Sequence, residues 1–353
     1  MTDLQQIKAG IIGFGGMGFH HGTHLMALAD GLELKGVFDT DPERMNLAKE
    51  RGFSAYSSQE ELLADPDISF VVVATPNDFH PAIAEAAMRA GKNVMLEKPA
   101  TITAGEFEKL IEIAEETGRI LTVHQNRRFD SDYLIIKEVL AGGRLGEVFS
   151  VHSCVHGSNG IPPGWRKVKR QGGGMLLDWG VHLLDQLLLV IPGKIARVYC
   201  TMQTLPDGSD ECFDLTLTFE SGLNAVVSVG TKNFIPQPRW LVCGNLGAAQ
   251  VDGWNCVGKV VTVKDTEVYF EPEIVYTTAG PTKTMAPRNK LTVDEVPLPA
   301  IRGDEGAFYQ TLISALRGKS KPIVDNAEVL RVLRVMEAAR TSYETGRAIE
   351  FNM

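Results

Sequence analysis

Short runs of β-branched and other apolar residues alternate with amphipathic segments over the first 126 residues of the chain. Five of these runs are predicted to be strands, at 8–13, 32–39, 69–75, 92–98 and 119–125. Helix signals lie between them: a proline follows Asp41 and another follows His80, and Thr103 and Glu106 have capping-box spacing. Strands that alternate with helices are typical of a parallel sheet covered on both faces. We therefore predict an α/β domain with a doubly wound sheet.

After residue 126 the pattern changes to runs in which apolar and polar residues alternate. The predicted strands are 147–155, 195–204, 213–230 and 259–270, and the Pro, Gly and Asp turns between them favour hairpins. Helices are expected at 131–141, 304–317 and 326–346. We predict two domains, a parallel one at 1–126 and an α+β one at 127–353 with a large, mostly antiparallel, open sheet. The pattern leaves open whether the last helix packs on the second domain or on the first.

Composition and charge narrow the classes of function. Forty-four acidic and 35 basic residues give the 353-residue chain a net charge of -9, which disfavours binding to nucleic acid. No apolar run reaches the roughly 18 to 20 residues of a membrane span, and the N-terminus lacks the pattern of a signal peptide. The cysteines are scattered and odd in number, which indicates reduced thiols: Cys154, Cys200, Cys212, Cys243 and Cys256. We expect a cytoplasmic protein with a small-molecule ligand and neither a nucleic-acid nor a membrane partner.

A G-x-G-x-x-G pattern follows the first predicted strand and opens a helix, at Gly13, Phe14, Gly15, Gly16, Met17 and Gly18. In this place the pattern is typical of a Rossmann dinucleotide site, because glycines let the backbone approach a pyrophosphate at the helix N-terminus. Asp39 lies 21 residues beyond Gly18, where a carboxylate accepts hydrogen bonds from ribose hydroxyls and repels a 2′-phosphate. The predicted cofactor is NAD, in preference to NADP. The alternative is a glycine turn that serves packing alone.

Ligands of a doubly wound sheet bind beyond the carboxyl ends of its strands. The cofactor-binding residues expected after the third and fourth strands are Thr75, Pro76, Asn77, His80, Glu97 and Lys98. Lys98 ends an apolar strand and precedes a proline, so it is predicted to be fixed at the cofactor crevice rather than to emerge into solvent. After the fifth strand come Asn126, Arg127 and Arg128, which could reach the substrate, although at least one arginine is expected to form an ion pair between the domains.

Histidines cluster in the helix after the glycine pattern. His20 and His24 have the i, i+4 spacing of a metal pair. No third ligand is apparent, and an open helix face or the edge of the cofactor explains His20, His21 and His24 as well. No metal site is predicted.

Three ionisable residues, Asp178, His182 and Asp185, lie in the apolar segment 172–186. On a helix their spacing places them along one stripe, which requires a polar partner because burying unpaired charge is unfavourable. Three interpretations compete: an acid/base site, a metal site, or a hydrogen-bonded core network. Asp185 either binds substrate or holds a backbone group. Residues of the preceding loop are predicted to cap the pocket: Asn159, Trp165 and Arg166.

Six stretches occur in one order between residue 7 and about residue 190: GIIGFGGMG, VFDTDPER, ATPNDFH, EKP, NRRFD and GGGMLLDWGVHLLD. As a set they resemble the glucose-fructose oxidoreductase / inositol dehydrogenase (Gfo/Idh/MocA) family. The resemblance implies that Lys98 lies beside the nicotinamide and that Asp178 and His182 form the D-x-x-x-H pair of the substrate site. It also implies a homo-dimer or homo-tetramer formed through the open face of the second sheet. Beyond residue 190 no functional residue can be matched.

The predicted function is NAD-dependent hydride transfer to or from a secondary hydroxyl of a sugar, glycoside or cyclitol. His182 would take the hydroxyl proton, Lys98 would stabilise the developing alkoxide, and Asp178 would orient or polarise them. The expected substrate-binding residues are Lys98, Asn126, Arg127, Asn159, Trp165, Arg166, Asp178 and His182. Two alternatives remain: a glycosidase-type enzyme that uses tightly bound NAD for transient sugar oxidation, and a non-catalytic dinucleotide-binding regulator.

Overall fold

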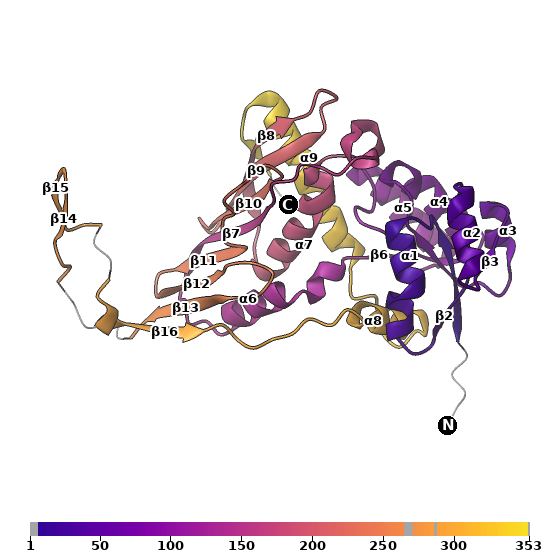
Figure 1. The fold of residues 1–353 in the computed structure, drawn as a ribbon, viewed down its shortest axis with the longest axis horizontal. Helices are drawn as coiled ribbons and strands as arrows, with labels where there is room; N and C mark the ends of the chain where they lie inside the picture. The colour runs from indigo at the N-terminus through magenta and orange to yellow at the C-terminus, as the bar shows by residue number, and fades with distance from the viewer. Residues whose placement is uncertain (1–5, 265–270, 286–287, 352–353) are drawn as a thin grey trace.

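The computed structural model describes residues 6–264, 271–285 and 288–351 of the chain. A six-stranded parallel sheet forms the N-terminal half, which lies to the right in Figure 1. Its strands are β1 (Ile7–Ile12), β2 (Leu32–Phe38), β3 (Ser54–Ala55), β4 (Phe70–Val73), β5 (Asn93–Leu96) and β6 (Leu121–Val123). The helices between them are α1 (Gly16–Thr23), α2 (Pro42–Glu50), α3 (Gln59–Ala64), α4 (His80–Arg89) and α5 (Ala104–Thr117). The predicted doubly wound sheet is confirmed.

The strand order β3-β2-β1-β4-β5-β6 reverses between β1 and β4. At such a switch point the helices leave toward opposite faces, so a crevice opens at the carboxyl ends of the strands. All four residues of β4 are buried, as expected of a strand covered on both faces. The five predicted strands are present, with ends that differ by at most two residues. Only β3 was not predicted, because a two-residue strand leaves no periodic pattern.

The second sheet has nine strands in the order β16-β13-β12-β11-β7-β10-β9-β8-β17. They are β7 (Val148–His156), β8 (Ile195–Thr204), β9 (Asp210–Phe219), β10 (Asn224–Gly230), β11 (Trp240–Gly244), β12 (Gly247–Val251), β13 (Gly258–Val263), β16 (Val293–Pro297) and β17 (Ile349–Glu350). The β7–β10 pair is parallel and the other pairs are antiparallel, so the expected mostly antiparallel sheet is confirmed. A separate hairpin joins β14 (Val275–Thr277) to β15 (Gly280–Thr282). The end of the predicted strand 259–270 lies outside the described residues.

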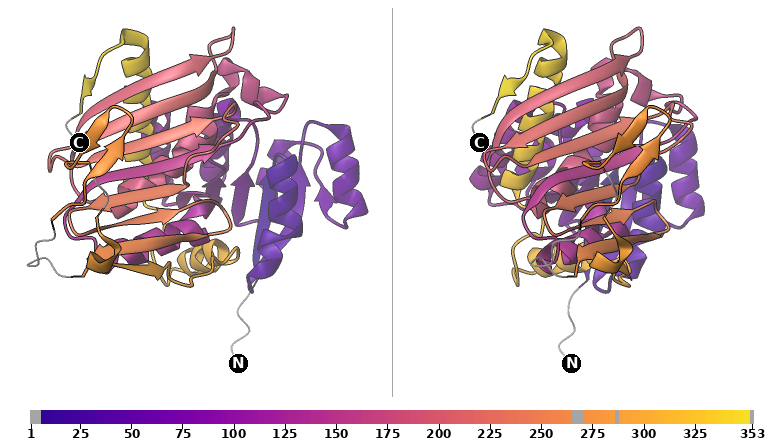
Figure 2. Two further views of the ribbon diagram at one scale, coloured as in Figure 1. Left: turned by 60° about the vertical axis from the view of Figure 1, so that its left-hand side comes forward. Right: turned by 90° about the vertical axis from the view of Figure 1, so that its left-hand side faces the viewer.

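Helices cover one face of the second sheet, and its strands face the viewer in the left view of Figure 2. The helices that cover this face are α6 (Ser131–Ala141), α7 (Val181–Val190) and α9 (Asn326–Thr345). The last helix, α9, contacts both halves: the Ser342 hydroxyl accepts from the Cys200 N–H of β8 at 3.0 Å, and Glu337 accepts from the Ala104 N–H of α5 at 2.8 Å. Helix α8 (Ala307–Leu316) packs on the N-terminal half. The two C-terminal helices therefore join the halves, which the sequence pattern left open.

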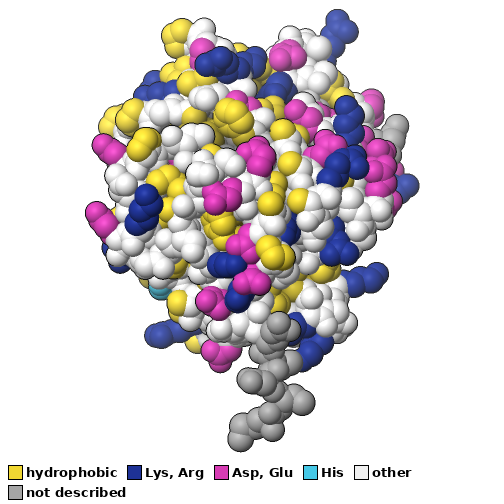
Figure 3. Space-filling view, turned by 90° about the vertical axis from the view of Figure 1, so that its right-hand side faces the viewer, with side chains coloured by type: hydrophobic (Ala, Val, Ile, Leu, Met, Phe, Trp, Pro, Cys, Tyr) yellow, Lys and Arg dark blue, Asp and Glu magenta, His cyan; other side chains and the backbone are white. Residues whose placement is uncertain are grey.

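The surface charges and the cysteines of the structure agree with what the sequence composition predicts. On the face over the N-terminal half, acidic and basic side chains are interspersed (Figure 3). The five cysteines are free thiols, as expected. Within the described ranges no helix is both long enough and apolar enough to cross a membrane.

Candidate active site

The glycine loop lies between β1 and α1 at the switch point of the first sheet. Gly13 has a φ of +90°, which favours glycine, and a side chain at Gly18 would collide with the carbonyl oxygen of Gly13. Gly15 and Gly16 line a cavity and have no atom in front of them within 4 Å. Two glycines therefore shape the turn, and the other two leave the N-terminal backbone of α1 accessible to a phosphate.

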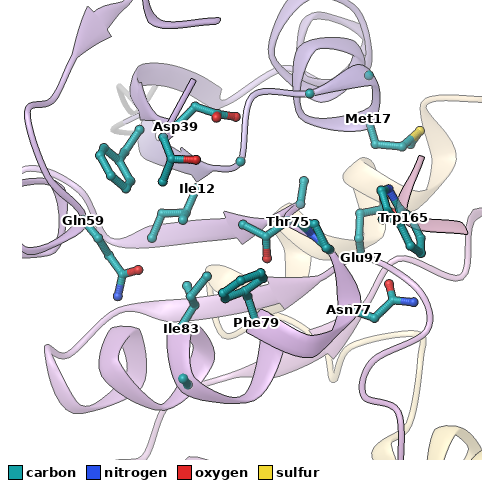
Figure 4. Close-up of a pocket in the computed structure, with 18 of the residues that line it drawn as sticks. Ile12, Met17, Asp39, Gln59, Thr75, Asn77, Phe79, Ile83, Glu97 and Trp165 are labelled. Carbon is teal, nitrogen blue, oxygen red and sulfur yellow. The ribbon is translucent and has the colours of Figure 1, made fainter. Parts of the chain in front are cut away.

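Asp39 follows β2 and holds the glycine loop as well as facing the cavity. Its Oδ2 accepts from the Phe14 backbone N–H at 2.6 Å, and its Oδ1 accepts from the Asp41 N–H at 2.9 Å. The Phe14 side chain is fully buried in the core. The carboxylate still lines the cavity (Figure 4), where it presents negative charge and free acceptor positions.

A cavity of about 830 Å³ runs from Asp39 past the glycine loop to Lys98. Ten of the predicted cofactor residues line it: Gly13, Gly15, Gly16, Met17, Asp39, Thr75, Pro76, Asn77, Glu97 and Lys98. The structure adds apolar and polar wall residues that the sequence did not single out: Ile12, Gln59, Phe79 and Ile83, which Figure 4 labels, and Phe38. These residues come from separate elements and share no local pattern. The Thr75 hydroxyl is buried without a hydrogen-bond partner among the described residues, which suits a polar ligand.

Three predicted cofactor residues lie behind the cavity wall: Phe14, Gly18 and His80. The His80 ring is fully buried, with Nδ1 3.1 Å from the Pro99 carbonyl and Nε2 3.0 Å from the Thr75 carbonyl. Both ring nitrogens are therefore engaged by the backbone. His80 joins the end of β4 to the segment after Lys98 instead of facing the cavity.

Lys98 forms an ion pair with Asp178 across the two halves. Its Nζ lies 2.9 Å from Oδ1 and 2.9 Å from the carbonyl oxygen of Asp178, while Arg166 Nε lies 3.2 Å from Oδ2. Burial alone raises the pKa of Asp178, but the charges of Lys98 and Arg166 outweigh burial and hold this pKa below its ordinary value. The Asp178 carboxylate is therefore ionised, and its ion pair fixes the orientation of the Lys98 side chain.

His182 is the third residue of the predicted catalytic group and is only 4% exposed. Burial, followed by the charges of Lys98 and Arg127, lowers its pKa well below the usual value. Its Nδ1 is buried and has no hydrogen-bond partner in the described part of the chain. The imidazole is therefore neutral at physiological pH and able to accept a proton.

The segment that carries these residues is not one regular helix. Leu176–Gly180 forms a π-helical turn before α7, and the Leu176 N–H donates to Asp210 of β9 at 2.6 Å. Both oxygens of Asp185 are taken by Arg128, at 2.6 and 2.8 Å. The expectation that Asp185 binds substrate or a backbone group is therefore wrong. Arg128 does form an ion pair, but its partners Asp185 and Glu328 lie in the same predicted domain, 127–353. The expected ion pair between the domains is therefore wrong for Arg128, and Arg127 likewise pairs with nearby Asp130. Asp178 therefore pairs with Lys98 and Arg166, whereas Asp185 pairs with Arg128.

Asn77 joins the two walls of the cleft. Its Nδ2 donates to the Gly172 carbonyl at 3.1 Å, and a side chain at Gly172, whose φ is +76°, would collide with Asn77. This close approach brings the loop with Trp165 and Arg166 to the dinucleotide cavity, where both residues form part of the wall.

Two family models match the chain. The model described as an oxidoreductase family with an NAD-binding Rossmann fold matches residues 7–125, and the model of the GFO/IDH/MocA C-terminal domain matches residues 133–250. The chain belongs to the Gfo/Idh/MocA oxidoreductase family. The resemblance seen in the motifs before residue 190 thus continues into the second sheet.

Similar proteins match this Gfo/Idh/MocA chain over nearly its full length. The solved structure of an NAD-binding protein from Listeria innocua is 41% identical, with a TM-score of 0.94, and the match covers 98% of this chain and 100% of that one. The scyllo-inositol 2-dehydrogenase (NADP(+)) IolW of Bacillus subtilis is 27% identical over 98% of this chain and 96% of its own. An uncharacterized oxidoreductase of Escherichia coli, YdgJ, is 29% identical over 94% of both.

In this Gfo/Idh/MocA protein a second cavity of about 500 Å³ lies on the far side of Asp178 and shares Arg166 with the first. Four predicted substrate residues line it: Arg127, Asn159, Arg166 and Asp178. It also contains residues that the sequence did not single out: His156, Trp179, Thr231 and Trp254. The Arg127 guanidinium lies 4.3 Å from the Trp179 ring and 5.2 Å from that of Trp254. The second sheet therefore supplies the outer wall of the site.

Four predicted substrate residues have other places. Asn126 and His182 are not among the residues that line either cavity, whereas Lys98 and Trp165 line the dinucleotide cavity. Figure 4 shows Trp165 there. Thr231 Oγ1 is buried and has no hydrogen-bond partner among the described residues, so it offers a further polar contact. Thr231 follows β10 by one residue, and no sequence motif marks it.

The three helix histidines divide into two groups. The rings of His20 and His24 stack at 5.0 Å, and His24 Nε2 lies 2.9 Å from Glu305. His21 is instead fully buried. The explanation of all three as an open helix face or cofactor edge is therefore wrong for His21, which points to Glu97 at the end of β5.

We expect acid to destabilise this protein through His21 and His182. Burial lowers the pKa of both imidazoles, so both are neutral in the folded state, whereas an unfolded histidine titrates at about 6.5. Below about pH 6.5 the unfolded state then binds more protons, so this part of the stability is complete above that pH and is lost as the pH falls. Calorimetry should show an unfolding midpoint that declines between about pH 7 and about pH 5.

The His182→Asn variant should show a shallower decline. His24→Asn serves as the matched control, because His24 is half exposed, and it should retain the full decline. Identical slopes in the wild type and His182→Asn would contradict the assignment of His182 as a buried neutral imidazole.

Proposed function

We propose that this protein is an NAD-dependent oxidoreductase that transfers hydride between nicotinamide and a secondary hydroxyl of a sugar, glycoside or cyclitol. The observation that carries the proposal is the Lys98–Asp178 ion pair, 2.9 Å long, at the junction of the two cavities. Lys98 lines the dinucleotide cavity and Asp178 lines the outer one. A cation fixed between two ligand sites suits stabilisation of charge that develops on an oxygen.

The residues of the first cavity fit a dinucleotide. Gly15 and Gly16 would hold its pyrophosphate at the start of α1, and Asp39 would accept from a ribose hydroxyl. Thr75 offers a buried hydroxyl that has no partner within the described chain. When bound, the nicotinamide supplies the hydride acceptor or donor.

Each residue of the central group has one task in the proposed reaction. The neutral His182 ring accepts the hydroxyl proton during alcohol oxidation and returns it during reduction. Lys98 donates a hydrogen bond to the reacting oxygen, and Asp178 holds the lysine in position. The lowered pKa of His182 keeps this base unprotonated at neutral pH.

The outer cavity supports a neutral polyol as the substrate class. It combines amide, hydroxyl and indole groups, namely those of Asn159, Thr231, Trp179 and Trp254. Its two arginines already have acidic partners, Arg127 with Asp130 and Arg166 with Asp178. Indole faces pack against the C–H surface of a sugar ring, and the polar groups suit ring hydroxyls. Relatives named for related activities are the Bacillus subtilis scyllo-inositol dehydrogenase and an inositol 2-dehydrogenase of Salmonella agona, 29% identical over 63% of this chain.

A substrate screen tests the function. Purified protein is mixed with NAD+ and panels of inositols, hexoses and aryl glycosides, and NADH absorbance is followed together with release of the aglycone. Accumulation of NADH with one class of polyol supports the dehydrogenase. Aglycone release without NADH would assign the glycosidase-type reaction. Cofactor binding with neither signal would favour the regulator.

Asp39 should make the protein prefer NAD+ to NADP+, because a carboxylate repels a 2′-phosphate. Two cations line the cavity, Lys98 and Arg166. Each directly follows in the chain a residue that Figure 4 shows at the end away from Asp39, Glu97 and Trp165 respectively. The Asp39→Ser variant is expected to bind NAD+ about tenfold more weakly than the wild type, a loss of about 1.4 kcal/mol. Its affinity for NADP+ should rise relative to its affinity for NAD+. Titration calorimetry with both cofactors measures the ratio.

Asp30→Ser provides the control for this ratio, since Asp30 is exposed and lies outside the dinucleotide cavity. The control should bind both cofactors as the wild type does. A tighter affinity for NADP+ than for NAD+ in the wild type would contradict the preference, and IolW is a relative whose name states NADP(+).

The two-domain division at 1–126 and 127–353 and the homo-oligomer also form part of the proposal. The support for an oligomer is the face of the second sheet opposite its helices, where Tyr199 is 43% exposed beside the buried Val198 and Cys200. Large apolar side chains on an uncovered sheet favour association with a second copy.

A further inference from the structure

A buried carboxylate lies directly behind Lys98. Glu97 is 6% exposed, and its Oε1 accepts from His21 Nε2 and from His124 Nδ1, each at 2.7 Å. Its Oε2 accepts from the Lys98 backbone N–H at 3.2 Å. Three donors from three separate elements therefore converge on one carboxylate.

The surroundings of Glu97 keep it ionised. The Tyr309 hydroxyl lies 2.7 Å from His21 Nδ1. Burial lowers the pKa of His21, so the ring is neutral; its Nε2 proton points to Glu97, and Nδ1 therefore accepts from the tyrosine hydroxyl. Burial alone raises the pKa of Glu97, but the interactions with His124 and His21 outweigh it and hold this pKa well below the ordinary range. The Glu97 carboxylate is therefore ionised although it is buried.

The side chains of His21, Glu97 and His124 are close enough to hold a metal ion, since their ligand atoms lie within 4.8 Å of one another. The 2.7 Å separations from Oε1 are those of charge-assisted hydrogen bonds. An imidazole nitrogen that carries a proton toward a carboxylate cannot ligate a metal. Hydrogen bonds account for the cluster.

Glu97 also lines the dinucleotide cavity, at the end that Figure 4 shows beside Trp165 and away from Asp39. Asp39 and the glycine loop suit the adenosine ribose and the pyrophosphate. The remaining end, with Glu97 and Lys98, is then the end for the nicotinamide.

We propose that Glu97 raises the affinity of the protein for oxidised dinucleotide relative to reduced dinucleotide. The oxidised nicotinamide ring is a cation and the reduced ring is neutral, so an anion at that end stabilises only the oxidised form. Lys98 and Arg166 at the same end share the one carboxylate of Asp178, so Glu97 supplies the second negative charge that balances these two cations. The inference rests on the proposed nicotinamide-dependent function and adds a preferred direction of the reaction, namely oxidation of the alcohol. A protein loaded with NAD+ is ready to oxidise its polyol.

The test compares the affinities of NAD+ and NADH in the full-length protein by calorimetry. Glu97→Gln should weaken NAD+ at least about tenfold relative to NADH, the effect of one charge at roughly 8 Å with an effective dielectric constant of about 20. Glu97→Met repeats the comparison without an amide N–H facing the Lys98 backbone and serves if the Gln variant does not fold.

Two controls separate charge from other effects. Tyr309→Phe removes the hydroxyl on His21 but leaves the Glu97 carboxylate, so the NAD+/NADH ratio should stay at the wild-type value while the unfolding temperature falls. Asp39→Ser acts at the other end and should weaken both redox forms by the same factor.

An unchanged ratio in both Glu97 variants overturns the proposal. Failure of the wild type to bind either redox form would instead overturn the proposed function, so the two failures are distinguishable.

Discussion

Lys98→Met should lower kcat/KM for polyol oxidation by about a hundredfold to a thousandfold, the loss typical of a donor to a developing oxyanion. The Nζ atom is the cation that Asp178 holds at 2.9 Å between the two cavities, and methionine retains the length of the side chain without its charge. NAD+ affinity should change far less than kcat, because the glycine loop and Asp39 remain. Steady-state kinetics with the polyol found in the screen, and calorimetry with NAD+, give the two values.

Lys259→Met is the matched control for Lys98→Met. Lys259 is 51% exposed and pairs with Glu295 on β16, away from the residues that line either cavity. This variant should turn over at the wild-type rate. Wild-type kcat/KM in Lys98→Met would remove Lys98 from the proposed reaction.

Arg128→Met should lower the free energy of unfolding by about 3 to 5 kcal/mol. Arg128 meets both oxygens of Asp185, and the two side chains are 7% and 3% exposed. Removal of the guanidinium leaves a buried carboxyl without its partner, and burial already raises the pKa of Asp185 in the folded protein. Denaturant titration and calorimetry measure the loss.

The double variant Arg128→Met/Asp185→Leu should regain most of this stability, because no unpaired charge then remains buried. Glu328, the other partner of Arg128, is 40% exposed and can be hydrated. Arg89→Met, at an exposed pair with Glu85, should cost less than about 1 kcal/mol. If Arg128→Met is no more harmful than Arg89→Met, the pair does not have the structural role assigned to it.

Much of the fold was predictable because its evidence is local. The five predicted strands of the first sheet show as runs of mostly apolar residues, and α5 begins at a complete capping box between Thr103 and Glu106. Strands such as β11 and β12 were missed, because five residues that include glycine carry too little periodicity. Their pairing with β7 and β13 depends on segments far away in the sequence.

The sequence alone indicated the dinucleotide loop, the importance of Lys98 and the polar character of the segment with Asp178 and His182, because each depends on residues close together in the chain. Only the tertiary structure decided the partners. Lys98 meets Asp178 across 80 positions, Arg128 meets Asp185 across 57, and His21 meets Tyr309 across 288. Such contacts depend on how helices and sheets pack, and no local spacing encodes them. For this reason Asp185 proved to be an ion-pair residue, and Glu97 proved to be the centre of a buried network.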